Sequence, residues 1–103
     1  MMERDYEGLL ILEPALSEEA VEKESKDITL LFPEGAVTCQ NLGLKKFTYE
    51  IKHQAQGYYL SVNFKADAGK RTEFEQNVRL NPAVLRYLII LAPRTKRKEK
   101  NGS

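Results

Sequence analysis

Four segments of the chain have the length and composition of β-strands, and two others carry apolar residues at helical spacing. The strands expected are residues 6–14, 36–51, 58–64 and 83–93, and the helices are residues 17–32 and 67–80. The resulting order, β-α-β-β-α-β, is that of a ferredoxin-like sandwich. We therefore predict an α+β fold in which a four-stranded, mainly antiparallel sheet has both helices on one face.

Capping and breaking residues support the two helices. Ser17 is a good N-cap, and it is followed by two glutamates in the first turn, where the helix dipole favours anions. The second helix has Phe74 and Val78 one turn apart as buried anchors, with Leu80 as a further candidate. Asn81 precedes a proline, and a residue in that position is pushed out of the helical region.

Residues 45–53, "KKFTYEIKH", alternate almost perfectly between apolar and polar side chains. Strand periodicity predicts that Phe47 and its apolar neighbours face the core, and that the opposite set lies on the uncovered face of the sheet: Lys46, Thr48, Glu50 and Lys52. Gly43 is a natural position for a β-bulge within this long strand. The same parity places these residues of the other strands on the uncovered face: Glu7, Leu9, Ile11, Tyr59, Ser61, Asn63, Arg86, Leu88 and Ile90.

An uncovered sheet face of this composition is typical of an interaction surface. Leu9, Ile11, Leu88 and Ile90 would form an exposed apolar patch. The cations expected beside it, Lys46, Lys52 and Arg86, favour a partner that is at least partly anionic.

The 103 residues are enough for one folded domain, which we place at residues 1–93. Residues 94–103, "RTKRKEKNGS", carry five cations and one anion and are too polar to pack, so we expect a disordered basic tail. The single cysteine and single histidine exclude an internal disulfide and a zinc or haem spacing, so we predict no metal and no cofactor. A reducing, cytosol-like compartment fits, and we find no signal peptide or membrane-spanning run.

We find no residue set that would carry out catalysis. His53 lacks an orienting partner in the sequence, Cys39 is explained as a small strand hydrophobe, and no phosphate-binding glycine loop is present. We therefore predict that the protein is not an enzyme.

Five segments in register resemble the bacterial ribosomal small-subunit protein six family: "RDYE", "LSEEAVEK", "GLKKFTYEI", "QGYY" and "RLNPAVLRYLII". Together they span roughly residues 4 to 91. The resemblance implies a cytoplasmic component of the small ribosomal subunit that binds the central domain of small-subunit ribosomal RNA. It also implies a heterodimer with ribosomal small-subunit protein eighteen, no membrane and no small-molecule substrate.

The resemblance and the predicted open face together give two sets of site residues. The RNA-binding set consists of residues carried over position by position, Arg4, Tyr6, Lys45, Lys46, Arg79, Asn81 and Arg86, and of Lys52, a cation expected beside the open face. The set for the partner protein is Leu9, Ile11, Thr48, Tyr59, Leu88 and Ile90. Glu50 departs from the family, which usually has proline there, and it adds an anion to the expected binding side.

The alternative is a ferredoxin-like module that binds no RNA and instead binds a small ligand or dimerises through its sheet. An acylphosphatase-like enzyme is a weaker option, because the link after the first strand is acidic and contains Pro14 in place of a phosphate-binding loop.

Overall fold

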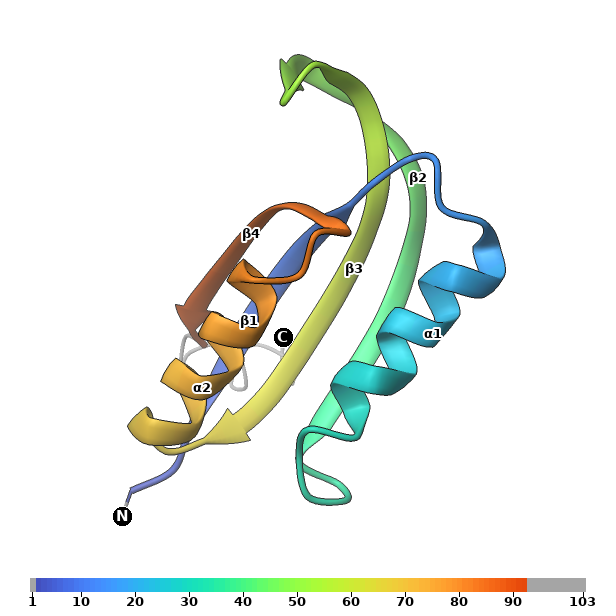
Figure 1. The fold of residues 1–103 in the computed structure, drawn as a ribbon. Helices are drawn as coiled ribbons and strands as arrows, with labels where there is room; N and C mark the ends of the chain where they lie inside the picture. Colours follow the sequence, from blue (N-terminus) through green and yellow to red (C-terminus); the bar gives the residue numbers. More distant parts are fainter. Residues whose placement is uncertain (1, 93–103) are drawn as a thin grey trace, which may run out of the picture.

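The computed structural model describes residues 2–92 and contains the six expected elements in the expected order (Figure 1). Their bounds are β1 Arg4–Leu12, α1 Glu18–Thr29, β2 Val37–Ile51, β3 Gln54–Ala66, α2 Ala68–Arg79 and β4 Val84–Leu91. The basic tail predicted for residues 94–103 lies outside the described residues.

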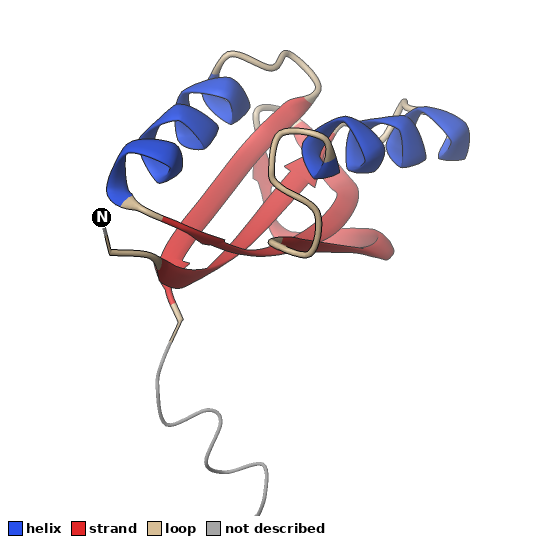
Figure 2. Ribbon diagram, turned by 90° about the horizontal axis from the view of Figure 1, so that it is seen from below, coloured by secondary structure: helices blue, strands red, loops and turns tan. Residues whose placement is uncertain are grey.

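The strands form one sheet in the order β2-β3-β1-β4, and every neighbouring pair is antiparallel. Both helices lie on the same side of this sheet, and the other side carries no helix (Figure 2). The ferredoxin-like architecture predicted from the sequence is therefore confirmed. β2 and β4 are the edge strands, and β2 and β3 extend together well beyond the end of β1 (Figure 1).

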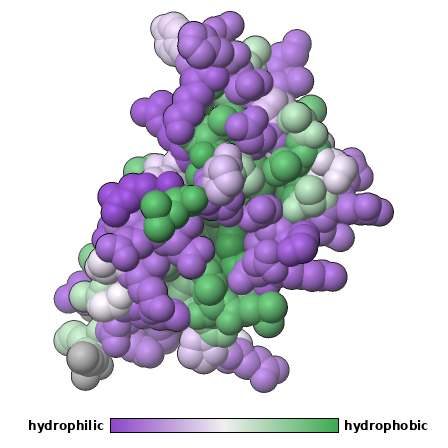
Figure 3. Space-filling model, viewed as in Figure 1, coloured by the Kyte–Doolittle hydropathy of each residue, from purple (hydrophilic) through white to green (hydrophobic). Residues whose placement is uncertain are grey.

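The hydrophobic core lies between the sheet and the helices. Leu12, Leu60, Val62 and Val21 are fully buried there, and three aromatic side chains pack around Phe64: Tyr6, Phe32 and Phe74. Figure 3 shows apolar side chains along the strip between α1 and α2, with polar residues around it. A single core of this kind is what a chain of this size can bury.

The N-cap predicted at Ser17 is confirmed, and Asp67 caps α2 in the same way although the sequence analysis did not single it out. Ser17 Oγ accepts a hydrogen bond from the Ala20 backbone N at 3.1 Å, and Asp67 Oδ1 accepts one from the Lys70 N at 2.8 Å. Each side chain satisfies a backbone donor that has no partner within its helix.

Both helices end earlier than predicted. α1 stops at Thr29, and a tight turn follows that places Phe32 in the core. In α2, Phe74 and Val78 are buried as expected, but Leu80 is 80% exposed and adds nothing to the core. Leu80 is the C-cap, and its backbone still has right-handed helical angles, with φ −86° and ψ −4°.

A one-residue bulge interrupts β2 where the sequence predicts one. Asn41 pairs with Leu60 and Gly43 pairs with Tyr59, so Leu42 has no partner on β3. Gly43 has a φ of 92°, and its N–H donates to Asn41 Oδ1 at 2.8 Å. Glycine adopts this left-handed conformation without steric cost.

Candidate nucleic-acid interface

The uncovered face of the sheet has a defined set of side chains, because directly paired residues in antiparallel strands point to the same side. One cross-strand row joins Gln40, Ser61, Leu9 and Leu88, and the next joins Gly43, Tyr59, Ile11 and Arg86. A third row contains Glu7 and Ile90. The predicted placement of Leu9, Ile11, Tyr59, Arg86, Leu88 and Ile90 on this face is therefore confirmed.

Within this face, the exposed apolar area is concentrated on β4. Leu88 is 58% exposed and Ile90 is 45% exposed, while Leu9 and Tyr59 are half-buried. Ile11 is only 8% exposed, so it supports the surface but offers little of it to a partner.

Phe47 and Tyr59 lie beside Ile11 on the uncovered face. Its ring lies 6.2 Å from the Tyr59 ring, centroid to centroid, on the uncovered face. A Cβ placed on Gly57 would lie 3.0 Å from Phe47 Cζ and 2.9 Å from Ile11 Cγ2. The glycine therefore leaves the space in which Phe47 and Ile11 lie, and together with Tyr59 these residues form an apolar cluster on the open face.

This position of Phe47 contradicts the prediction for the second half of β2. Lys45 pairs with Gly57 and lies on the open face, as Gly43 does two residues earlier. Lys46 pairs with Gln56 and lies on the side of the helices. The prediction was wrong because the bulge at Leu42 shifts the alternation by one residue, which sends each later side chain to the opposite face.

The alternation predicted for Thr48, Glu50 and Lys52 fails for a second reason. The ladder jumps from Lys46 paired with Gln56 to Ile51 paired with Gln54, so four residues of β2 stand opposite one residue of β3. Regular parity does not hold across such an irregular stretch. Thr48 is exposed within it, and Lys52 lies in the turn itself.

The turn at the end of this hairpin is shorter than the sequence suggests. Only Lys52 and His53 connect the strands, with φ values of 51° and 66°. Two successive left-handed residues are the mark of a type I′ hairpin turn, which usually contains Asn-Gly. The polar residues that follow, Gln54 to Gln56, belong to β3 and not to a loop.

Three of the predicted RNA-binding residues meet around one hollow of about 480 Å³. Lys52 comes from the hairpin turn, Arg79 from the end of α2 and Arg86 from β4. Figure 1 shows that the hairpin tip leans toward the side of the sheet on which β4 lies. Apolar and aromatic side chains complete the lining: Ile51, Val78, Val84, Leu85 and Tyr87, together with Glu50.

Arg4 and Tyr6 lie at the other end of the sheet, away from this hollow. Tyr6 faces the helices, stacks on Phe64 at 5.3 Å between ring centroids and has the Arg71 guanidinium 5.7 Å from its ring centre. Tyr6 is therefore a packing residue, and of the two predicted residues only Arg4 is exposed to solvent. The hollow beside them has more carboxylates than cations in its lining, since it includes Glu3, Asp5 and Glu7.

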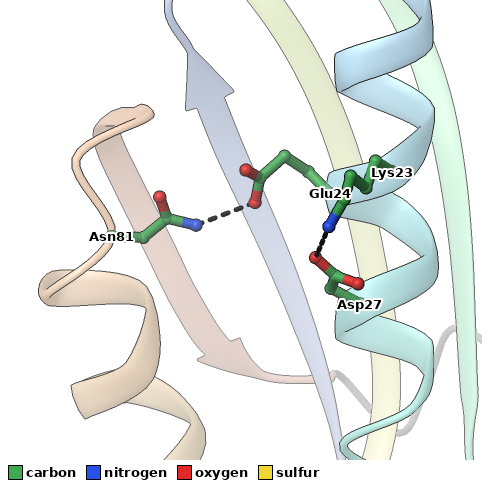
Figure 4. Close-up of polar contacts among 4 residues, drawn as sticks. All are labelled: Lys23, Glu24, Asp27 and Asn81. Atoms are coloured by element: carbon green, nitrogen blue, oxygen red, sulfur yellow. Dashed lines mark hydrogen bonds and ion pairs between the residues drawn. The ribbon is translucent and has the colours of Figure 1, made fainter.

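Asn81 connects the two helices. Its Nδ2 donates to Glu24 Oε1 at 2.8 Å (Figure 4), and its Oδ1 accepts from the Ala83 backbone N at 2.9 Å. The neighbouring ion pair between Lys23 and Asp27 lies along α1 and does not reach α2 (Figure 4). Both ends of the Asn81 amide are thus used within the protein, so we leave it out of the binding surface.

Sequence reasoning missed Ile51, Leu85 and Tyr87 as members of the hollow. Ile11 pairs with Arg86 and Leu12 pairs with Val84, so Leu85 between them has no partner on β1. Its side chain is nevertheless buried. Tyr87 is fixed from the other side, because its hydroxyl donates to Glu75 Oε2 at 3.1 Å. Burial and this hydrogen bond raise the pKa of Tyr87 above its ordinary value. The alternation of β4 could have placed Tyr87 toward the helices, but no sequence signal marks the bulge.

Within residues 2–92, no group of three or more histidine, cysteine, aspartate or glutamate side chains is arranged to hold a metal ion. None of the described helices is long and apolar enough to cross a membrane.

Comparison with known proteins identifies the family. The model of the family described as "Ribosomal protein S6" matches residues 5–91. The chain belongs to the ribosomal protein S6 family. It is therefore a ribosomal protein of the small subunit, and the family consists of structural ribosomal proteins and not of enzymes, as predicted.

Relatives and a solved structure agree over nearly the whole chain. The small ribosomal subunit protein bS6 of Trichormus variabilis is 39% identical over 97 residues, covering 91% of this chain and 90% of the relative. The bS6 protein of Helicobacter hepaticus is 33% identical over 88 residues, covering 82% of this chain and 64% of the relative. The crystal structure of 30S ribosomal protein S6 from Thermotoga maritima has a TM-score of 0.83 at 27% identity, with 97% of each chain covered. The S6 fold and the place of this chain in the small ribosomal subunit are thus supported independently.

Proposed function

We propose that this S6 protein binds the central domain of small-subunit ribosomal RNA as a pair with ribosomal small-subunit protein eighteen. The observation that supports this proposal best is the uncovered sheet face, which combines an exposed apolar stripe with unpaired cations. Leu88 and Ile90 supply the stripe, and Lys45 and Arg86 supply the charges. Among the described residues, neither cation forms an ion pair.

The two parts of the surface suit two partners. An exposed apolar area of this kind on a small domain is typical of a protein–protein contact. Cations without carboxylate partners are suited to phosphates, which they bind with little dependence on base sequence. Leu9 and Tyr59 support the protein contact from below, and Lys45 reaches from the hairpin toward RNA.

The distribution of charge over the rest of the fold supports the same orientation. α1 carries five carboxylates and two lysines, and it lies on the covered side of the sheet. A polyanion is repelled from that side and approaches the uncovered face or the sheet edges.

The test is filter binding of the central-domain RNA fragment by the full chain, with and without protein eighteen, across a series of salt concentrations. We expect protein eighteen to strengthen binding, and we expect the logarithm of affinity to fall linearly with the logarithm of salt concentration. Binding that neither the partner nor salt affects would contradict the proposal.

A matched pair of variants separates surface contact from general charge. Lys45→Ala removes a cation from the hairpin on the open side, and Lys26→Ala removes one from the exposed side of α1. We expect the first to weaken RNA binding several-fold and the second to leave it unchanged. Equal effects would mean that only net charge matters.

Dimerisation through the sheet remains the second candidate, because Leu88 and Ile90 are exposed on an edge strand. Sedimentation of the protein alone tests it. A stable homodimer that Leu88→Ser disrupts, combined with no RNA binding, would favour this reading over the first.

A further inference from the structure

The hollow at the start of β4 has the features of a ligand site. Its volume of about 480 Å³ lies within the range of roughly 300–1,000 Å³ that small-molecule sites occupy. Three elements that are distant in the sequence contribute to its lining, namely the β2–β3 hairpin, the last turn of α2 and β4. Such a site forms only in the folded protein, so its chemistry is a property of the fold.

Part of the lining of the hollow is apolar and aromatic. Ile51, Val84 and Leu85 provide aliphatic surface, and Tyr87 provides a ring. The ring is held in place, because the Tyr87 hydroxyl donates to Glu75 Oε2 and Glu75 Oε1 accepts from Arg71 Nη1 at 3.0 Å. A fixed aromatic ring beside aliphatic side chains suits a flat heterocycle.

Three cations also belong to the lining of the hollow. Lys52, Arg79 and Arg86 are exposed, and among the described residues none of them forms an ion pair. Lys52 is held by a two-residue turn whose backbone is left-handed at both positions. Since such turns allow little variation in backbone geometry, the position of the Lys52 main chain at the rim is well defined.

We propose that this hollow binds one unpaired nucleotide of RNA, with the base against Tyr87 and Leu85 and the phosphate among Lys52, Arg79 and Arg86. This inference rests on the proposed function and specifies where an RNA strand contacts the protein. An aromatic platform beside unpaired cations is how proteins hold single-stranded RNA, in which the bases are free to leave the stack. An acidic peptide would use the cations but would leave the apolar side without a matching group.

Two features oppose the anion and predict modest affinity. Glu50 is the one carboxylate in the lining, and the C-terminal end of α2 carries the negative pole of the helix dipole. The three cations outnumber these two negative contributions. Because the net attraction for an anion is reduced, the site favours a ligand that also contacts the apolar part of the lining. Glu50→Gln is therefore expected to strengthen nucleotide binding several-fold.

The first experiment is an NMR titration of the full-length, ¹⁵N-labelled protein with adenosine 5′-monophosphate, and separately with inorganic phosphate at equal concentrations. We expect the nucleotide to shift the amide signals of residues 51–52 and 84–87 together, with much smaller shifts from phosphate. No shift at these residues, or equal shifts from both ligands, would overturn the proposal.

Variants test the two halves of the site separately. Tyr87→Leu should weaken adenosine monophosphate binding at least five-fold while leaving the weak phosphate response unchanged. The double variant Lys52→Gln, Arg79→Gln should weaken both. Its matched control is Lys26→Gln, Lys65→Gln, which removes the same charge at exposed positions outside the hollow and should change neither. Equal losses in the two double variants would mean that net charge alone is responsible.

A comparison of RNA with free nucleotide identifies the source of the ligand. We expect hexaadenylate to bind at least ten-fold more tightly than adenosine monophosphate and to shift the same signals. Tighter binding of the free nucleotide would overturn the assignment to RNA.

The central-domain RNA fragment separates this inference from the proposed function. If the wild-type protein binds the fragment while the hollow signals stay unchanged, the inference fails and the function stands. If adenosine monophosphate and hexaadenylate bind in the hollow but the fragment does not bind at all, the proposed function fails instead.

Discussion

Replacing Gly57 by alanine tests the arrangement of the uncovered face most directly. A Cβ at this position would lie 2.7 Å from the Leu12 carbonyl oxygen, 2.9 Å from Ile11 Cγ2 and 3.0 Å from Phe47 Cζ. All three distances are at or below the shortest that carbon makes in well-packed interiors, and the closest atom belongs to the backbone of the central strand β1. The protein can relieve the contact only by moving β3 away from β1.

The size of the effect follows from this geometry. Overpacking a well-packed site costs about 1–3 kcal/mol. We expect the upper part of that range because a backbone oxygen cannot rotate away. In a domain of this size, each kcal/mol lost from the free energy of unfolding lowers the melting temperature by roughly 4–8 °C. The loss is therefore measurable by thermal and urea unfolding monitored by circular dichroism.

Gly69→Ala is the matched control. The nearest atom to a Cβ on Gly69 is Asp67 Oδ1 at 3.5 Å, an ordinary contact, and the residue lies in the first turn of α2. Alanine is favoured over glycine in helices by up to about 1 kcal/mol, so this variant should be as stable as the wild type or more so. If Gly57→Ala and Gly69→Ala have the same stability, the packing of Phe47 and Ile11 over Gly57 is wrong.

Three further predictions concern single side chains. Asn81→Ala should destabilise the protein by about 1–2 kcal/mol in urea unfolding, because it leaves the Glu24 carboxylate without its donor; Glu24→Gln, which keeps an acceptor, should cost less, and the reverse order would contradict the assigned contact. Burial and the hydrogen bond to Glu75 raise the Tyr87 pKa in the folded state, so this contribution to stability is fully present below pH 10 and is lost as the pH rises through the folded-state pKa. Tyr87→Phe should therefore show a flatter loss of stability above pH 10, and identical alkaline profiles would refute the role of the hydroxyl. Lys45→Ala should reduce the salt dependence of ribosomal RNA binding by about one unit of slope without changing the melting temperature, which filter binding and calorimetry measure together.

Local sequence signals predicted the elements well where the chemistry is local. The cap at Ser17 and the glycine bulge in β2 depend on a few neighbouring residues, so they could be recognised without knowledge of the fold. The cap at Asp67 is equally local but was not recognised. The order of the elements then limited the topology to a familiar one. The apolar residues of β1 and β4 were assigned to the correct face for the same reason, since Leu9 and Leu88 lie in regular parts of the ladder.

The candidate site was predicted less well because it depends on register and on long-range contacts. Gly43 was recognised as a bulge position, but its effect on the alternation downstream was not applied, and Phe47 and Lys46 were therefore exchanged between the faces. The hairpin turn was missed because Lys52 and His53 are unusual in left-handed positions. Asn81 resembled a binding residue in the sequence, and only the packing of α2 beside α1 shows that Glu24 uses its amide.

The unpaired residue Leu42 also bears on how this surface can change through evolution. Removing that single codon would make Gly43 follow Asn41 directly and keep it opposite Tyr59, so Lys45 and Phe47 would stay on their present side. One codon lost after Gly43, by contrast, would exchange the side chains that the distal hairpin shows to each side. A change of one residue in length, too small to disturb the rest of the domain, would thus replace the side chains on its contact surface in one step. Homologues that differ by one residue in this segment should be aligned by the side each residue faces, and not by residue type alone.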